Sequence, residues 1–213
     1  MTIIMTITKI EIFYDKIADE FDKTRVSLWR CVISFLNEFK NGSMVLDIGC
    51  GNGKYMNYRN DIIMKGIDIS INLVEICKKK GFDVTKAAMT DIPYPDNCFD
   101  GFISIASYHH LTNDEDRKRT LDEMHRILKI GGIGLIEVWA QEQPNNINKN
   151  ASNFKRKSNL VKWTSIKTGE IYYRYYNIYS NGDIENEIMR LKPEFKIIES
   201  GYEKGNYYIK IMK

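Results

Sequence analysis

The chain has 213 residues, which is long enough for one domain with a substantial core and short for two. Its hydrophobic fraction of 43% and charged fraction of 28% are those of a folded globular protein and exclude an intrinsically disordered chain. The formal net charge of +3 permits contact with a polyanion without requiring it, so any nucleic-acid-binding surface must be local.

The chain begins with "MTIIMTITKI", which is too short for a membrane span and lacks the basic region and cleavage site of a signal peptide. Residues 11–39 then alternate charged and apolar positions at near-helical spacing, which predicts an N-terminal helical segment. We therefore expect no membrane-embedded part, and one or two amphipathic helices before the core of the domain.

Strands and helices alternate from residue 44 onward. The run "MVLDIG" (44–49) predicts a short buried strand, and "GIDIS" (66–70) predicts a second. The segment "SINLVEICKKKG" (70–81) is typical of a helix, because Ser70 can cap its start and Gly81 can end it. A third strand is predicted by "FDVTKAA" (82–88).

The alternation continues through residue 140. "FDGFISIAS" (99–107) predicts a fourth strand, and "IGLIEVWA" (133–140) predicts a fifth. Between them, residues 112–132 have the pattern of a helix, with Thr112 to Glu115 as its expected capping box. Strands alternating with helices at this spacing predict an α/β fold with a mostly parallel sheet.

The alternation stops after Gln143. Residues 144–170 are polar and basic and predict a long loop, and we assign 144–180 as a basic insertion on the substrate side of a single domain spanning 1–213. The runs "EFKIIES" (194–200) and "NYYIKIM" (206–212) then predict a terminal antiparallel pair.

Four cysteines are spread widely through the chain, without a CxxC motif and without a histidine at zinc-site spacing: Cys31, Cys50, Cys77 and Cys98. We therefore expect no metal site and no disulfide framework. This use of cysteine fits a reducing compartment, so we expect a cytoplasmic protein.

A glycine-rich segment, "VLDIGCGNGKY", follows the first predicted strand and contains Gly49, Gly51 and Gly53. A tight turn and a close backbone approach to a ligand both favour a residue without a Cβ atom. The spacing is G-x-G-x-G, so the dinucleotide fingerprint G-x-G-x-x-G fails where it requires its third glycine. A bare strand-to-helix turn would also explain this segment.

Three aspartates accompany the glycines at successive strands. Asp68 ends the second strand, where a carboxylate can accept from both hydroxyls of a ribose, and Asp91 follows the third strand, where it can accept from an adenine amino group. Asp47 lies in the first strand, where it can hold the glycine loop and an ammonium group. Each could be only a cap, but together they favour an adenosine-bearing ligand.

The set "VLDIGCGNG", "GIDIS", "TDIPYPDNCFD" and "LKIGGIGLI" resembles the successive motifs of the class I S-adenosylmethionine-dependent methyltransferases over residues 44–137. The resemblance implies a seven-stranded, mostly parallel sheet with helices on both faces and a C-terminal antiparallel hairpin, and S-adenosylmethionine as cofactor. It places the glycines at the methionine moiety, Asp68 at the ribose, and Asp91 with Ile92 at the adenine. The other cofactor-binding residues that it implies are Tyr14, Arg25, Asp47, Cys50, Ile69 and Ala106.

Further segments are similar, in order, to the eukaryotic tRNA wobble-uridine carboxymethyl methyltransferases: "YDKIADEFDKTR", "SIASYHHL", "IEVWAQEQ", "VKW", "RYYNIY" and "ESGYEKGNYYIKI". The resemblance implies methylation of the carboxylate of 5-carboxymethyluridine in the anticodon stem-loop of tRNA. The chain departs from the family in a shorter segment before "VKW", and in Tyr173 where the family has Gln.

For such a reaction the acceptor carboxylate, with a pKa of about 4, is already ionised at neutral pH and needs no general base. The site must instead position the reactants and exclude water. Candidate groups to hold the carboxylate are Arg25, Arg174 and one of His109 and His110, and Trp139 is a candidate wall against the uracil. None of these residues is expected to bind metal.

Each candidate has a structural alternative. Arg25 could pair with Asp22 or Glu20 on a helix face, and one of the two histidines is expected only to pack. Trp139 could be an ordinary core residue. Most tyrosines near Arg174 are expected to pack, whereas Tyr176 is assigned to substrate binding by stacking.

The basic stretch from Lys149 to Lys167 is either a solvated loop or a surface for phosphate contacts to the anticodon stem-loop. We assign four of its residues to substrate binding: Lys155, Arg156, Lys157 and Trp163.

The resemblance also implies a partner, a small zinc-binding methyltransferase activator protein that pairs with the edge strand of the sheet, here Phe82 to Ala88. A plain surface edge shielded by Lys86 is the alternative. Two other functions compete with the tRNA assignment: a small-molecule methyltransferase of the same fold, and a catalytically silent scaffold subunit.

Overall fold

The computed structural model describes residues 9–144 and 154–213, and its centre is a seven-stranded sheet. The strand order is β3-β2-β1-β4-β5-β9-β8. Neighbouring strands pair in parallel except at β9, which runs antiparallel to both β5 and β8. The predicted fold class, including the terminal antiparallel pair, is confirmed. The strands are β1 (Met44–Ile48), β2 (Ile63–Asp68), β3 (Val84–Lys86), β4 (Phe99–Ile105), β5 (Leu128–Trp139), β8 (Lys196–Glu203) and β9 (Asn206–Met212).

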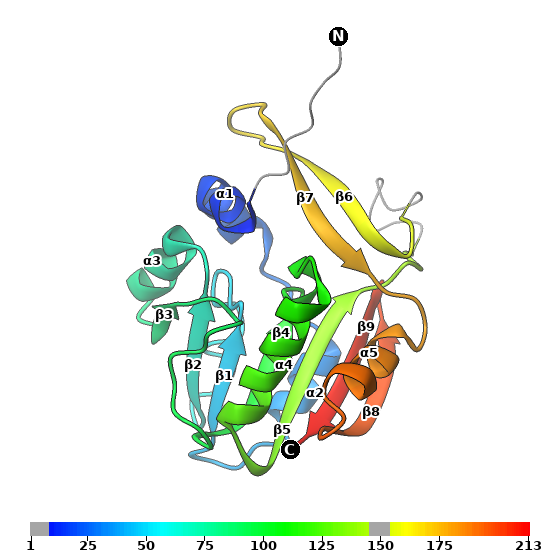
Figure 1. The fold of residues 1–213 in the computed structure, drawn as a ribbon. Coiled ribbons are helices and arrows are strands. Elements are labelled where there is room, and N and C mark those ends of the chain that lie inside the picture. The colour runs from blue at the N-terminus through cyan, green and yellow to red at the C-terminus, as the bar shows by residue number, and fades with distance from the viewer. Residues whose placement is uncertain (1–8, 145–153) are drawn as a thin grey trace.

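Helices cover both faces of this sheet (Figure 1). On one face α4 (Asp114–Ile127) and α5 (Asp183–Leu191) bury Leu121, Met124 and Ile188 against the strands. On the other, α2 (Arg30–Leu36) and α3 (Ile71–Lys79) contribute to a second core cluster. Burial of these apolar faces is the main stabilising contribution to the layered arrangement.

The helix starts follow local hydrogen-bond chemistry. Ser70 caps α3 as predicted, because its Oγ accepts from the N–H of Leu73 at 3.2 Å. The capping box expected at Thr112 to Glu115 is wrong: Asn113 caps α4, and its Oδ1 accepts from the N–H of Asp116 at 2.8 Å. An asparagine side chain accepts this bond as well as threonine does, so the cap forms one residue later.

Two elements stand above the carboxyl ends of the parallel strands: α1 (Ile10–Thr24) and a hairpin of β6 (Lys157–Thr164) and β7 (Ile171–Ile178) (Figure 1). The prediction of a loop through residue 170 is therefore wrong. Val161 and Trp163 pack inward whereas their neighbours Leu160, Lys162 and Thr164 are exposed, which gives the two-residue period of a strand. The exposed apolar Leu160 and the single lysine between Val161 and Trp163 conceal this period in the sequence.

In the residues that the structure describes, no helix is long and apolar enough to cross a membrane. The same residues contain no group of three histidine, cysteine or acidic side chains arranged to hold a metal ion. Residues 145–153, which include Lys149 of the predicted basic surface, lie outside the described part of the chain.

Candidate functional site

A cavity of about 600 Å³ lies at the carboxyl ends of β1, β2, β4 and β5, under α1 and the β6–β7 hairpin. Ligands of open α/β sheets bind at this edge, and the volume is within the range of about 300–1,000 Å³ typical of small-molecule sites. Most predicted site residues line it: Tyr14, Arg25, Asp47, Gly49, Cys50, Gly51, Asp68, Ile69, Ala106, His109, His110, Trp139, Trp163, Arg174 and Tyr176.

The glycine loop forms the floor of the cavity. Gly49, Gly51 and Gly53 have backbone φ values of 75°, 57° and 74°, which residues with a Cβ atom rarely adopt. A Cβ on Gly49 would come within 2.5 Å of the Cβ of Ser107. Gly53 faces Phe82 and Cys77 instead of the cavity, so its role is to close the turn.

Asp68 and Asp47 are the buried acids of the site. The two carboxylate oxygens of Asp68 accept from the N–H groups of Gly51 and Ser70, both at 2.9 Å, and burial raises the pKa of Asp68 to about 6. Asp47 is 2% exposed, and its Oδ2 has no partner among the described residues. Burial raises the pKa of Asp47 to about 7, although Lys54 opposes this shift. An unpaired buried oxygen of this kind suits a bound ammonium group.

Asp91 and Ile92 do not line the cavity. Asp91 is exposed, and Ile92 is 3% exposed within the core, where its N–H donates to Glu123 at 2.7 Å. Beyond β2 and β3 the cavity is lined instead by Ile69, Leu73, Ala87 and Met89.

Helix α1 is fastened across the cavity. The side-chain amide of Asn52, next to the glycine loop, donates to the carbonyls of Asp22 and Arg25 at 3.2 and 3.1 Å. Near the other end, Asp15 accepts from the hydroxyl of Ser70 at 2.6 Å. These bonds bring Tyr14 and Phe21 of α1, and Arg25 directly after it, into the lining.

The two histidines have different surroundings. His110 donates from Nδ1 to the carbonyl of Tyr175 at 3.0 Å, because a carbonyl can only accept. Its Nε2 therefore accepts from the hydroxyl of Tyr14 at 2.9 Å. In His109, Nδ1 accepts from the N–H of Trp139 at 3.2 Å, which leaves the proton on Nε2, and this atom has no partner among the described residues. His110 thus joins α1 to β7, whereas His109 has an available donor.

Both imidazoles are neutral at pH 7. Burial, followed by His110 and Arg174, lowers the pKa of His109 well below its ordinary value. Burial lowers the pKa of His110 to about 3, and Arg174 adds to this effect. Neither histidine is therefore a cation that could pair with an anionic ligand.

Arg174 is the buried cation of the site. It is 5% exposed, has no acidic partner within ion-pair distance in the described residues, and its Nε has no hydrogen-bond acceptor there. The guanidinium carbon lies 4.7, 5.2 and 5.0 Å from the ring centres of Phe13, Trp163 and Tyr176. Three aromatic rings stabilise a cation partially, but a buried charge ordinarily requires an anion.

Arg25 also lies near Trp163, with its guanidinium carbon 5.8 Å from the centre of that ring. The two acids that could have paired with it are engaged elsewhere. Glu20 accepts from the hydroxyl of Ser165 at 2.6 Å in the hairpin turn, and Asp22 binds Lys80 at 2.5 Å. The cavity is thus lined by two arginines without acidic partners in the described chain.

Aromatic side chains form the wall beside Arg174. Trp139 stacks on Tyr176 with ring centres 4.5 Å apart and an interplanar angle of 26°. Tyr176 is 2% exposed and also packs against His109 at 4.7 Å. Tyr176 therefore presents little surface for stacking on a base.

Lys155, Arg156 and Lys157 lie outside the cavity lining. Arg156 forms an ion pair with Asp183 at the start of α5, so its charge is already compensated. The structure does not bring this basic cluster to the cavity.

Several lining residues were missed by the sequence analysis, among them Lys54, Ser107 and Asn206. Lys54 directly follows the glycine loop, and its ammonium lies 4.5 and 4.7 Å from the rings of Trp29 and Tyr55. The position of Lys54 directly after the glycine loop could have identified it as a site residue from the sequence. Asn206 begins β9, and nothing in the local sequence indicates that this end of β9 reaches the cavity.

A family model described as a methyltransferase domain matches residues 46–136. A tRNA (carboxymethyluridine(34)-5-O)-methyltransferase of Schizosaccharomyces pombe is 34% identical over 214 residues, which cover 92% of each chain. One from Arabidopsis thaliana is 40% identical over 153 residues, 72% of this chain and 35% of that relative. The chain thus spans about a third of the Arabidopsis relative and 40% of a Xenopus tropicalis one.

A solved structure shares the fold. A chain in the complex between the Haloferax volcanii Trm112 methyltransferase activator and a methyltransferase aligns with a TM-score of 0.69 and 15% identity. The alignment covers 96% of this chain and 97% of that one. At this identity the likeness establishes the architecture alone.

Proposed function

The chain belongs to the family of tRNA (carboxymethyluridine(34)-5-O)-methyltransferases, and from that premise we propose that it methylates the carboxylate of 5-carboxymethyluridine at the wobble position of tRNA. The product is the methyl ester. The observation that carries the proposal is Arg174, a buried guanidinium that lines the cavity without an acidic partner in the described residues. A substrate carboxylate supplies the missing anion.

The residues of the cavity fit S-adenosylmethionine. Each oxygen of Asp68 accepts one backbone N–H, so lone pairs remain for the two ribose hydroxyls. The unpaired Oδ2 of Asp47 suits the ammonium group of the cofactor. Gly49 and Gly51 line the cavity at positive φ, and a Cβ on either would press against Ser107 or Phe21, so glycine keeps the loop in the shape that receives the methionine moiety. Asp91 and Ile92 are left out of the proposed cofactor site.

When bound, S-adenosylmethionine supplies an electrophilic methyl group. The chain holds the acceptor: Arg174 binds the carboxylate, Arg25 adds positive charge from α1, and the Nε2–H of His109 donates to one oxygen. Trp139 forms the wall against the uracil. Aromatic side chains exclude water, which would stabilise the separated charges more than the transition state.

No general base is required, because the acceptor carboxylate is ionised at neutral pH. The two neutral histidines agree with this requirement, since their pKa values are lowered by burial. We assign His109 to orienting the carboxylate and His110 to holding Tyr14 and β7 in place.

The test is methyl transfer to tRNA isolated from cells that lack this modification. The chain is incubated with that tRNA and S-adenosylmethionine, alone and with a Trm112-type activator, and the nucleosides are analysed by mass spectrometry. We expect 5-carboxymethyluridine to be converted to its methyl ester. Absence of the ester in both incubations, with cofactor binding intact, would overturn the proposal.

We further propose that a small zinc-binding activator protein pairs with the edge of the sheet at Phe82 to Ala88. The support is the strand order, in which β3 lies at the edge beside β2 and has only three residues. Lys86 protects this edge only partly, because its ammonium group forms an ion pair with Glu11 of α1 at 2.7 Å. Residues 83 and 87 bond to β2, so the N–H of Lys86 faces the free edge of β3. Co-expression with the activator should raise the soluble yield, and Lys86→Pro, which removes this free N–H, should abolish the gain.

A further inference from the structure

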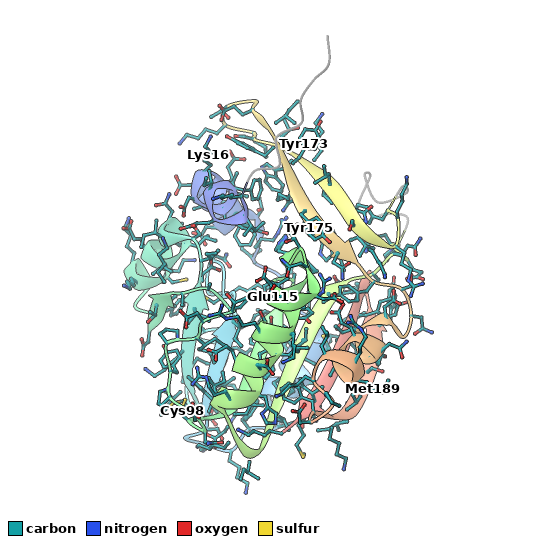
Figure 2. All side chains as sticks on the ribbon, in the orientation of Figure 1. Lys16, Cys98, Glu115, Tyr173, Tyr175 and Met189 are labelled. Carbon is teal, nitrogen blue, oxygen red and sulfur yellow. The ribbon has the colours of Figure 1, made fainter. Side chains whose placement is uncertain are left out.

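The β6–β7 hairpin has two faces with different surroundings. Residues of its inner face, Val161, Trp163, Arg174 and Tyr176, line the cavity. On the outer face, Tyr173 lies opposite Lys162, and Tyr175 opposite Leu160. Figure 2 labels both tyrosines on β7, with Tyr175 nearer to the main sheet.

Packing does not account for the composition of the outer face. A ribbon with one buried face is expected to be polar on the other. Here Leu160 and Ile171 are 41% and 51% exposed, and both tyrosines are partly exposed. Among the described residues, neither tyrosine ring packs against another aromatic ring, and Tyr173 has no side-chain hydrogen bond. Tyr175 has one, between its hydroxyl and that of Ser158 at 3.2 Å.

The charge of the hairpin indicates what covers this face. Residues 154–178 contain one acidic residue, Glu170, and six basic ones. Arg156 is paired with Asp183 and Arg174 is buried on the inner face, which leaves four exposed lysines: Lys155, Lys157, Lys162 and Lys167. Aromatic rings within a positively charged surface are the features that bind single-stranded nucleic acid, because bases stack on the rings and phosphates meet the cations. A protein-binding face of the same size would be expected to carry fewer lysines.

The outer face also adjoins the proposed acceptor site. Lys162, on the outer face, lies between the cavity-lining residues Val161 and Trp163 and opposite Tyr173 on the neighbouring strand. The carbonyl of Tyr175 accepts from His110, so the backbone that carries the outer rings is fixed to the wall of the cavity. One strand thus positions the inner cation and the outer rings together.

We propose that Tyr173, Tyr175 and Lys162 form a stacking platform for the unpaired nucleotides that flank the modified uridine. This proposal rests on the proposed function and adds the part of the tRNA that the hairpin holds. The nucleotide in the cavity contacts the inner face, and its neighbours stack on the outer face. No base edge is read, so the platform accepts anticodon loops of different sequence.

The test measures the affinity of the full chain for an anticodon stem-loop RNA that carries 2-aminopurine next to the wobble position. Tyr173→Ala combined with Tyr175→Ala should weaken binding about tenfold or more, since stacking contributes roughly 1–3 kcal/mol per base, and should abolish the quenching of 2-aminopurine. The double Phe variant should retain both properties, because the rings remain. Tyr202→Ala, an exposed tyrosine on β8, is the matched control.

S-adenosylmethionine affinity should be unchanged in all variants. Unchanged RNA affinity and quenching in the double Ala variant would overturn the platform, including the case in which this face binds a protein. Methylation of tRNA by the wild-type chain, assayed alongside these binding measurements, would then still support the proposed function. Failure of the wild-type chain to bind or methylate any tRNA, with or without activator, would instead count against the proposed function.

Discussion

Among single substitutions, we expect those of Arg174 to reduce methyl transfer the most. Arg174→Ala removes a buried cation from the site and should lower kcat/KM for tRNA, with a loss of about 2–5 kcal/mol in transition-state stabilisation. Arg174→Lys should recover little, since an ammonium cannot donate two parallel bonds to a carboxylate. The measurements are steady-state methylation kinetics and cofactor affinity by calorimetry.

Two comparisons make the Arg174 prediction specific. Arg119→Ala, on α4 and away from the cavity lining, should behave as the wild type. Cofactor affinity should be unchanged in both Arg174 variants. Full activity of Arg174→Ala would show that another group binds the carboxylate.

Alanine substitutions of His109 and His110 should have different effects on turnover and on cofactor binding. His109→Ala removes the available Nε2 donor and should lower kcat while cofactor affinity is retained. His110→Ala removes the link between Tyr14 and the carbonyl of Tyr175, so it should weaken cofactor binding as well as turnover. Calorimetry and single-turnover kinetics measure the two effects. The same loss in both variants would show that the pair only packs.

The raised pKa of Asp47 predicts that cofactor affinity depends on pH. Burial raises its pKa in the free protein to about 7, and only the ionised carboxylate can bind the cofactor's ammonium group. Protonation below pH 7 therefore opposes binding, and affinity should fall by up to about tenfold per pH unit as pH decreases. Calorimetry between pH 6 and 8 measures the slope. Asp47→Asn should bind weakly with a flat profile, whereas Glu75→Gln on α3 should keep the wild-type slope.

Residues were predictable where a local pattern carries the chemistry. Gly49, Gly51, Asp47 and Asp68 lie within short motifs at strand ends, and all four line the cavity. The choice between His109 and His110 depended on partners at distant positions, Trp139 for one and Tyr14 with Tyr175 for the other. No local sequence pattern specifies such contacts.

At the scale of elements, α1 and the hairpin act together as the roof of the site. Glu20 of α1 accepts from the hydroxyl of Ser165 and, at 3.0 Å, from the N–H of Ile166 in the hairpin turn. Glu20→Ala should speed hydrogen exchange in both elements and raise the cofactor Kd several-fold, because the roof opens more often. The exposed neighbour Asp19 is the control, and its Ala variant should change neither quantity. Unaltered exchange in Glu20→Ala would refute the coupling.

The strands of the main sheet were predictable because their apolar runs are buried on both faces, as in β1 and β4. The hairpin was not, because only alternate residues of β6 face inward and the positions between them hold apolar as well as polar residues, among them Leu160 and Lys162. Its place over the cavity follows from the contacts of Phe13 with Trp163 and Tyr172, which join segments about 150 residues apart. Contacts at such separation are set by the whole fold.

At the scale of the whole molecule, the architecture accounts for the cofactor site but not for the acceptor. The sheet, the glycine loop and Asp68 form a cofactor site that a small-molecule methyltransferase would also have. The acceptor is determined by what α1 and the hairpin add above the sheet: two arginines, an aromatic wall and an outer face with aromatic and basic residues. These additions favour an anionic nucleotide over a small neutral acceptor.

The chemical nature of the methylated product distinguishes a carboxylate acceptor from every other acceptor in tRNA. tRNA is methylated by the chain with isotopically labelled S-adenosylmethionine and then exposed to mild alkali. If the acceptor is a carboxylate, the label is an ester and should be released as methanol, while the nucleoside returns to 5-carboxymethyluridine. Label that stays on the RNA through this treatment would place the methyl group on nitrogen, carbon or a ribose oxygen and would contradict the account.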